Sequence, residues 1–351
     1  MFLIEADYAL KYVNSDYTLD VKDVGLTDDD LKDMYQYTKD IATDSKGKLK
    51  ATTWQATPGL FAYRRSIAKD VLGTDDPDKV QEALSTWDKF DKVAEQAAAK
   101  GYKMLSGYDD SYRVFSNNVS APWVDSNNKI VIDDNIMKWV DQTKKYTDKG
   151  YNNKSSLWDS TWAADQGPSG KVFGFFYSTW GINFTLLGNS LATPVKEGGK
   201  EEVGNGIYGD YAVCEGPQSY YWGGTWITAA TGTDNANLVA DIMRKLTTDE
   251  AIMTDIVKAD SDFVNNKPAM EAAAQDDSYA FPVLGGQNPL AMFCAGADKI
   301  SLSNITEYDQ GCNEEFQNAM TGYFDGNYAT YDEALEAFYT AVTEKYPELT
   351  Y

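Results

Sequence analysis

The stretch TTWQATPGLFAYRRSIAKDVLG, Thr52 to Gly73, says more about the fold than any other part of the sequence. Residues 50–57 alternate in polarity as a β-strand does, and Pro58-Gly59 then breaks the pattern. An apolar run, LFAY at residues 60–63, resumes directly after the break. Such an interrupted strand suits a segment that crosses from one lobe of a protein to another.

Outward from this crossover, helices and short strands follow one another along the chain. Apolar residues at helical spacing predict helices at residues 28–41, 86–100, 134–149, 235–247, 249–259, 314–324 and 332–345. Short strands are predicted at residues 2–4, 102–105, 129–132, 172–177 and 208–213. This mixture indicates an α/β fold, and a length of 351 residues is too great for one core of ordinary size, so two lobes are expected.

The composition excludes several classes of function. A formal net charge of -23 would repel nucleic acid and anionic membrane surfaces, so neither is an expected partner. The absence of histidine removes the usual general base and the commonest zinc ligand. The three cysteines have no Cys-x-x-Cys spacing, so we expect no disulfide scaffold, metal or cofactor, although a bridge between Cys294 and Cys312 stays open.

Five segments together resemble one family, the maltose-binding-protein-like receptors that bind carbohydrates for ABC transporters (solute-binding family 1). Residues 52–73 are similar to the first crossover between the lobes of these receptors, and GKVFGFFYSTWG at 170–181 resembles the strand that ends in a cleft tryptophan. YYWGGTWITAAT at 220–231 resembles the returning crossover, LTTDEA at 246–251 the helix pair behind it, and GNYATYDEALEAF at 326–338 the C-terminal helix. Their order and spacing over nearly the whole chain carry the resemblance.

The resemblance implies a two-lobed, periplasmic-binding-protein-like fold with a cleft between the lobes. Residues 1–57 and 227–284 would form the N-terminal lobe, and residues 58–226 and 285–351 the C-terminal lobe. Family members begin with an export signal and then a strand, a helix and a second strand. MFLIEADYALKYV carries acidic residues where a signal peptide needs a basic start. MFLIEADYALKYVNSDYTLD resembles the stretch that normally follows these elements, so the resemblance implies a first lobe that is truncated at its N-terminus.

By the same resemblance the protein is not an enzyme but a receptor that binds a carbohydrate, expected to be an oligosaccharide, and delivers it to the membrane permease of an ABC transporter. Its full-length form would be an extracellular, membrane-anchored lipoprotein and a monomer. Aromatic rings cover the apolar face of a sugar, while amides and carboxylates bind its hydroxyls. Position near the crossovers singles out Trp54, Gln55, Trp222 and Trp226, and the resemblance implies Glu5, Asp7, Asp109, Tyr112, Trp180 and Asn288.

Several of these candidates leave alternatives open. The strand period of two places Trp222 and Trp226 on one face, about 13 Å apart, where both could bind sugar or one could be buried. Residues 223–224 between them either leave room for a ligand or form a bulge. Trp54 and Gln55 point to opposite faces of a strand, so only one is expected to lie fully in the cleft.

Two other classes of function compete with the receptor. A glycoside-active enzyme also combines acids and rings, but adjacent side chains such as Asp109 and Asp110 diverge and make a poor catalytic pair. One of these two acids could instead cap the following helix, and Trp180 could plug a core. A receptor for a peptide or a polyamine is the second rival, because the fold alone does not dictate the ligand.

Overall fold

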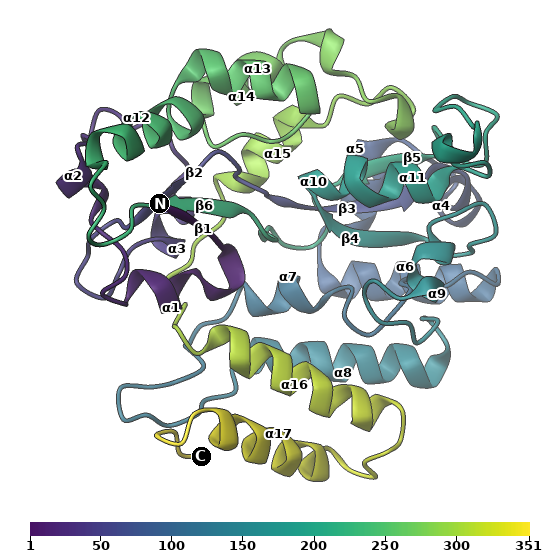
Figure 1. The fold of residues 1–351 in the computed structure, drawn as a ribbon. Helices are drawn as coiled ribbons and strands as arrows, with labels where there is room; N and C mark the ends of the chain where they lie inside the picture. The colour runs from purple at the N-terminus through teal and green to yellow at the C-terminus, as the bar shows by residue number, and fades with distance from the viewer.

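Two antiparallel sheets of three strands each lie at the centre of the computed structural model, which describes residues 1–351 (Figure 1). The first sheet has the order β1 (Phe2–Glu5), β6 (Thr225–Thr228) and β2 (Ala51–Thr53). The second sheet has the order β4 (Gly174–Ser178), β3 (Gly59–Arg64) and β5 (Tyr211–Cys214). We call the parts built on them the first and the second lobe.

The predicted crossover at Pro58 is confirmed, because β2 belongs to the first sheet and β3 to the second. The segment that crosses from the first sheet to the second lies beside the segment that crosses back. Pro58 pairs with Tyr221 in an isolated bridge, and the N–H of Gly59 donates to the C=O of Tyr220. A side chain at Gly59 would come within 2.3 Å of the Tyr220 ring. Only glycine therefore allows the two crossing strands to lie this close.

Short and medium helices cover the first lobe, with α12, α13 and α14 above its sheet in Figure 1. These helices are α1 (Ala9–Val13), α2 (Val21–Val24), α3 (Gln36–Ile41), α12 (Ala236–Thr247), α13 (Glu250–Asp260) and α14 (Lys267–Ala274), and the 3-10 turn η1 (Ala6–Tyr8) follows β1. The carboxylate of Asp249 accepts a hydrogen bond from the N–H of Ile252 and so caps α13. α12 packs on α2 and β2, which buries its apolar stripe.

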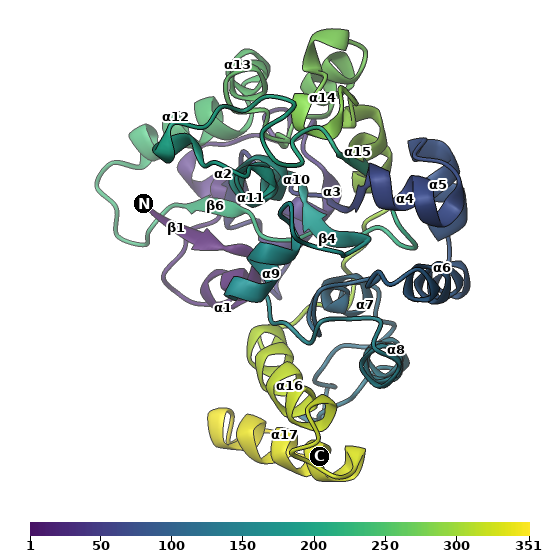
Figure 2. The ribbon, with the colours of Figure 1, turned by 90° about the vertical axis from the view of Figure 1, so that its right-hand side faces the viewer.

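The second lobe carries the remaining helices, and Figure 2 shows α8, α16 and α17 together at its lower end. Its helices are α4 (Arg65–Leu72), α5 (Pro77–Leu84), α6 (Trp87–Ala99), α7 (Tyr112–Ser116), α8 (Asp134–Lys149), α9 (Ser160–Asp165), α10 (Thr179–Gly181), the π-helix η2 (Ile182–Leu186), α11 (Leu187–Ser190), α16 (Asp309–Phe324) and α17 (Tyr331–Lys345). The 3-10 turns η3 (Val195–Glu197), η4 (Asp277–Tyr279) and η5 (Pro282–Leu284) lie in connections, and α15 (Leu290–Ala297) packs on both α14 and β3.

One continuous apolar core joins the two sheets, since Ile4 and Trp226 of the first and Phe61 of the second belong to it. A separate core holds α8, α16 and α17 together around Trp139 and Phe316. None of the helices is both long and apolar enough to span a membrane. The residue boundaries of the two lobes stay a prediction.

Most of the predicted helices are confirmed, and three elements are wrong. The helix predicted at 28–41 is reduced to α3, because the Asp30 carboxylate accepts hydrogen bonds from the N–H and hydroxyl of Thr27 and ties that segment into a turn. The strands predicted at 102–105 and 129–132 contain only isolated bridges, such as the one between Lys103 and Val172. The pairing is therefore too short to form a strand in either segment.

All three cysteines are free. Cys294 is half-buried and packs against the large core, whereas Cys312 is buried in the separate core around α16. The bridge that the sequence left open between them is absent, because the two residues belong to different cores.

Candidate functional site

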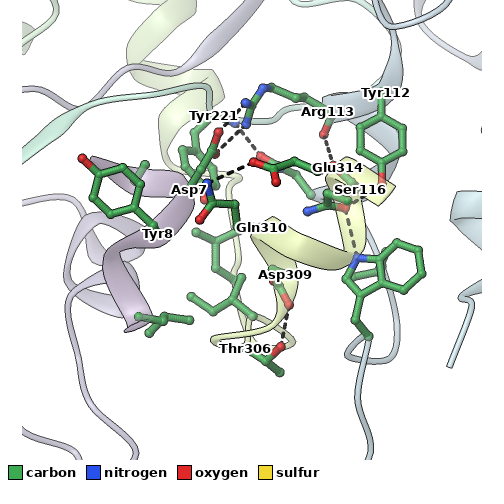
Figure 3. Close-up of a pocket in the computed structure, with 18 of the residues that line it drawn as sticks. Asp7, Tyr8, Tyr112, Arg113, Ser116, Tyr221, Thr306, Asp309, Gln310 and Glu314 are labelled. Carbon is green, nitrogen blue, oxygen red and sulfur yellow. Dashed lines mark hydrogen bonds and ion pairs between the residues drawn. The ribbon is translucent and has the colours of Figure 1, made fainter. Parts of the chain in front are cut away.

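A cavity of about 420 Å³ lies between the two lobes, with walls from segments far apart in the sequence (Figure 3). The first lobe supplies residues of η1 and α1, and the second supplies α7, α16 and the loops before α9 and α16. Its lining includes Asp7, Tyr8, Lys11, Asp109, Tyr112, Arg113, Trp158, Tyr221, Asp309, Gln310, Asn313, Glu314 and Gln317. The lining thus combines aromatic rings with converging polar side chains, both of which occur in small-molecule sites.

An ion pair between Arg113 of α7 and Asp7 of η1 joins the two lobes directly across this cavity (Figure 3). The guanidinium donates two hydrogen bonds, Nη1 to Oδ1 at 2.8 Å and Nη2 to Oδ2 at 2.6 Å. Burial works against the charged form of Asp7, but the charge and hydrogen bonds of Arg113 outweigh it and hold the pKa of Asp7 below its usual value. The Arg113 guanidinium carbon also lies 5.3 Å from the centre of the Trp222 ring, so two features fix its position.

A polar face of α16 forms another wall of the cavity. Its residues Gln310, Asn313, Glu314 and Gln317 recur at the i, i+3, i+4 and i+7 spacing that gathers side chains on one side of a helix. The Tyr112 hydroxyl donates to Asn313 Oδ1 at 2.5 Å. The amide of Asn313 therefore links α16 to α7 and holds the Tyr112 ring in the wall.

Trp158 presents the most accessible ring of the cavity wall, with 53% of its surface exposed. Three other indoles back it: Trp180 is nearly parallel to it, with ring centres 6.2 Å apart and planes at 14°, and Trp162 and Trp222 approach at 5.2 and 5.9 Å. The Trp158 backbone has a φ of 72°, in the left-handed region that side chains rarely adopt. The loop thus holds a large apolar ring at the surface in a strained conformation, which is typical of functional positions.

Asp159, next to that ring, fixes the loop by two hydrogen bonds. Its carboxylate accepts from the N–H of Trp162 at 2.7 Å and from the N–H of Ser156 at 3.0 Å, so the same side chain caps α9 and closes the turn before it. The N-terminus of α9 therefore sets the position of Trp158.

Asp109 and Asp110 have different surroundings, and neither caps α7, whose N-cap receives no side-chain hydrogen bond. Asp110 is buried and accepts from the N–H groups of Ser106 and Gly107 and from the indole N–H of Trp162, at 2.7–3.0 Å. Burial raises the pKa of Asp110 to about 6. Asp109 lines the cavity and accepts one weak bond, at 3.3 Å, from the N–H of Leu157.

Two further carboxyls near the cavity titrate close to neutrality. Burial raises the pKa of Asp309 to about 7, although the Thr306 hydroxyl donates to its carboxylate at 2.6 Å. Burial, together with the charge of Asp7, raises the pKa of Glu5 to about 7. Glu5 accepts a hydrogen bond from the N–H of Asp7, so it shapes η1 rather than lining the cavity. No three Cys, Asp or Glu side chains come close enough together to hold a metal ion.

Five of the ten predicted site residues come together. Asp7, Asp109 and Tyr112 line the cavity, and Trp180 and Trp222 form the support directly behind Trp158. Trp180 follows the end of β4, as predicted, and its indole N–H donates to the C=O of Trp222 at 2.9 Å.

The other candidates lie outside the cavity. Glu5 shapes η1, and the amide of Gln55 donates to Asp262 at 3.0 Å. Trp54 packs against the continuous core and against a smaller apolar core of the first lobe around Val21 and Met243, and Asn288 accepts a hydrogen bond at the start of α15. Trp226 is buried, with 1% of its surface exposed.

The prediction that Trp222 and Trp226 share a strand face is wrong. Gly223 and Gly224 have φ values of 74° and 112°, so β6 begins only at Thr225 and the alternation is interrupted between the two rings. Trp222 consequently packs with the rings of the second lobe, whereas the Trp226 indole N–H donates to the C=O of Thr38 inside the first. The glycines therefore act as a bulge-like break, the second alternative that the sequence left open.

Sequence reasoning missed Arg113, Tyr221 and the α16 face, and it did not single out Trp158. Polar residues at helical spacing on α16 could have indicated a binding face, but an ordinary solvent-facing helix has the same pattern. Arg113 gives no signal, because its partner Asp7 lies 106 positions away and only the fold brings them together.

Both the sequence and the fold of this chain are similar to those of known proteins. Residues 1–284 match the model of a family described as bacterial extracellular solute-binding protein. A crystal structure described as extracellular solute-binding protein family 1 has a TM-score of 0.82 at 18% identity, covering 97% of this chain and 85% of that one. No curated protein matches the sequence.

Two further similar structures contain sugars. The galacto-N-biose-/lacto-N-biose I-binding protein of the ABC transporter from Bifidobacterium longum, in complex with lacto-N-biose, has a TM-score of 0.71 at 13% identity, covering 99% of this chain and 84% of that one. An ABC transporter associated binding protein from B. animalis subsp. lactis, in complex with beta-1,6-galactobiose, has a TM-score of 0.70 at 17% identity, covering 99% and 85%.

Proposed function

Because this chain belongs to the bacterial extracellular solute-binding proteins, we propose that it binds a neutral carbohydrate and delivers it to the permease of an ABC transporter. The observation that carries the proposal is the half-exposed Trp158 ring, held on the wall of an interlobe cavity by three other tryptophans. A flat apolar ring beside carboxylates and amides matches the two chemistries of a sugar. The C–H face of the sugar packs on the tryptophan ring, and the sugar hydroxyls bind the carboxylates and amides.

The polar groups of the cavity suit the hydroxyls of a sugar. Arg113 is already neutralised by Asp7, so it offers no free cation for an acidic ligand. Asp109 and the amides of Gln310 and Gln317 line the same space and supply acceptors and donors for hydroxyl groups. The sugars named for two structurally similar receptors support the same choice.

The surroundings of Asp7 and Asp110 argue against a catalytic role for these two carboxyls. Asp7 binds Arg113 with both oxygens, and Asp110 is buried against three N–H donors. Neither carboxyl is therefore free to act as a nucleophile or a general acid. We propose a non-catalytic receptor that works as a lipid-anchored monomer outside the cytoplasm.

Calorimetric titration with lacto-N-biose, beta-1,6-galactobiose, maltose, a peptide mixture and spermidine tests this proposal. We expect saturable binding of at least one sugar and a loss of about fivefold or more in affinity for Trp158→Ala, because a ring contact at a desolvated site contributes about 1 kcal/mol or more. Tyr17→Ala is the control, since Tyr17 is 71% exposed and lies outside the cavity. Binding of spermidine or peptide alone, or sugar hydrolysis that Asp109→Asn abolishes, would contradict the proposal.

A further inference from the structure

Arg113 is the more enclosed of the two cationic side chains that line the cavity. The other is Lys11, which is exposed on α1, whereas Arg113 is partly buried. A partly buried cation attracts an anion more strongly than an exposed one, because water and salt screen it less. If Arg113 were free, it would therefore be the group of this cavity that binds a carboxylate of a ligand.

Asp7 occupies the part of Arg113 that such a ligand would need (Figure 3). It accepts hydrogen bonds from both terminal nitrogens of the guanidinium, at 2.8 and 2.6 Å. This two-pronged arrangement is the one in which arginine binds carboxylates in general, whether they belong to a protein or to a ligand. Asp7 thus occupies the position at which the carboxylate of a sugar acid would bind the end of the guanidinium.

The surrounding structure holds Arg113 at the cavity wall independently of Asp7. Its guanidinium carbon lies 5.3 Å from the centre of the Trp222 ring, which packs among other rings of the second lobe. The helix α7, which carries Arg113, is joined to α16 by the hydrogen bond from Tyr112 to Asn313. Removal of the Asp7 charge should therefore leave a cation on the wall of the cavity.

No carboxyl other than Asp7 forms an ion pair with Arg113. Glu5 affects Arg113 by its charge, but its carboxylate accepts a hydrogen bond from the N–H of Asp7 instead. The remaining charged groups of the lining are Lys11, Asp109, Glu307, Asp309 and Glu314. This excess of carboxyls makes the cavity unfavourable for any anion. Asp7 differs from them, because it also takes away the one directional partner of a carboxylate.

We propose that Asp7 is a specificity-determining residue, which admits uncharged sugars and excludes sugar acids because it keeps Arg113 from binding their carboxylate. The inference rests on the proposed function and narrows it, since it states which carbohydrates the cavity rejects. A neutral sugar needs no counter-charge and binds with the ion pair intact. A uronic or aldonic acid would reach the end of the guanidinium only by displacing Asp7, whose carboxylate would then lie partly desolvated without its partner.

Calorimetric titration with an acidic and a neutral derivative of the same disaccharide tests this inference. Oxidation of the reducing end of lacto-N-biose, beta-1,6-galactobiose or maltose gives an aldonate, and reduction gives an alditol, so the two derivatives share an open chain and differ in charge. We expect the wild type to bind the alditol at least about tenfold more tightly than the aldonate. Asp7→Asn should shift this ratio about tenfold or more towards the aldonate, the effect of a hydrogen bond between charged groups.

Two further variants are the controls for this shift. Asp7→Asn combined with Arg113→Gln breaks the same ion pair but leaves no cation, so it should gain no affinity for the aldonate. Asp298→Asn removes an equal charge from an exposed pair outside the cavity and should keep the wild-type ratio. The ratio also cancels any effect of a variant on the opening of the lobes, because both derivatives occupy the same cavity.

The outcomes separate this inference from the proposed function. Wild-type protein that binds none of the three disaccharides contradicts the proposed function, and the role of Asp7 falls with it. If a disaccharide binds, a wild type that binds the aldonate as tightly as the alditol overturns the role of Asp7 alone, and this result depends on the folding of no variant. Asp7→Asn protein that binds the aldonate no more tightly than the double variant overturns it as well, also where the wild type binds neither derivative.

Discussion

Arg113 and Asp7 connect the two lobes by a two-pronged ion pair, with nitrogen–oxygen distances of 2.8 and 2.6 Å. The two side chains are 28% and 34% exposed, so the pair is partly shielded from water. In a bidentate pair both charges are satisfied in one geometry, which makes it stronger than a typical surface pair. The contact lies on the cavity wall, where opening of the lobes must break it.

A double-mutant cycle on this pair should show strong coupling. We expect Asp7→Asn and Arg113→Met each to lower the free energy of unfolding by about 1–3 kcal/mol, less than for a fully buried pair, and the double variant to lose less than the sum. Urea unfolding measures the energies, and small-angle scattering should show a larger radius of gyration for Asp7→Asn. Asp298→Asn, which breaks the exposed pair with Lys267, is the control. Additive losses would mean that the two charges do not cooperate.

The same pair should persist to acid pH. Arg113 holds the pKa of Asp7 below its usual value, so Asp7 stays charged at neutral pH. A lowered pKa in the folded state gives a stabilisation that is present above the ordinary pKa and is lost as the pH falls through the lowered one. The radius of gyration of the wild type should therefore stay constant from pH 8 to pH 5, and expansion within that interval would contradict this reading.

Trp226 and Trp158 should respond differently to replacement by alanine. Trp226 is buried and hydrogen-bonded to Thr38, so Trp226→Ala should cost about 3–5 kcal/mol of stability. Trp158 is half-exposed, so Trp158→Ala should cost about 1 kcal/mol and act mainly on binding. Urea unfolding of both variants measures the contrast, and similar losses of stability would show that Trp158 is structural.

The sequence predicted the longer helices and the first crossover well, because their signals are local. α6 spans Trp87–Ala99 within the predicted residues 86–100, and α8 occupies the predicted residues 134–149. Strands with a single paired residue, such as Lys103 with Val172, could not be predicted, since pairing depends on a distant partner. The candidate site was only partly predictable for the same reason. Residue type singled out Trp222 and Trp226, but the φ values of two glycines send them to different lobes.

Asp110 should position the loop that carries the cavity residue Asp109 and leads into α7, which carries Tyr112 and Arg113. Three N–H donors point at its carboxylate, so Asp110→Asn places an amide N–H against one of them. We expect a loss of about 1–3 kcal/mol in stability at pH 8 and weaker sugar binding. Asp109→Asn is the matched control for stability, because Asp109 accepts one long bond and should cost little. Equal stability of the two variants would show that Asp110 does not anchor the loop.

Asp309 should make the protein less stable as the pH rises from about 4 to about 7. Burial raises its pKa to about 7, so the folded state holds this proton more tightly than the unfolded chain, and the resulting stabilisation is lost through that interval. In Asp309→Asn the amide oxygen can still accept the hydrogen bond from the Thr306 hydroxyl, but the side chain no longer binds or releases a proton. The variant should match the wild type near pH 4 and exceed it by at least about 1 kcal/mol at pH 8, since one unit of pKa corresponds to about 1.4 kcal/mol. Urea unfolding at four pH values measures the two slopes, with Asp298→Asn as the control. Parallel curves for wild type and Asp309→Asn would rule out a buried, titrating Asp309.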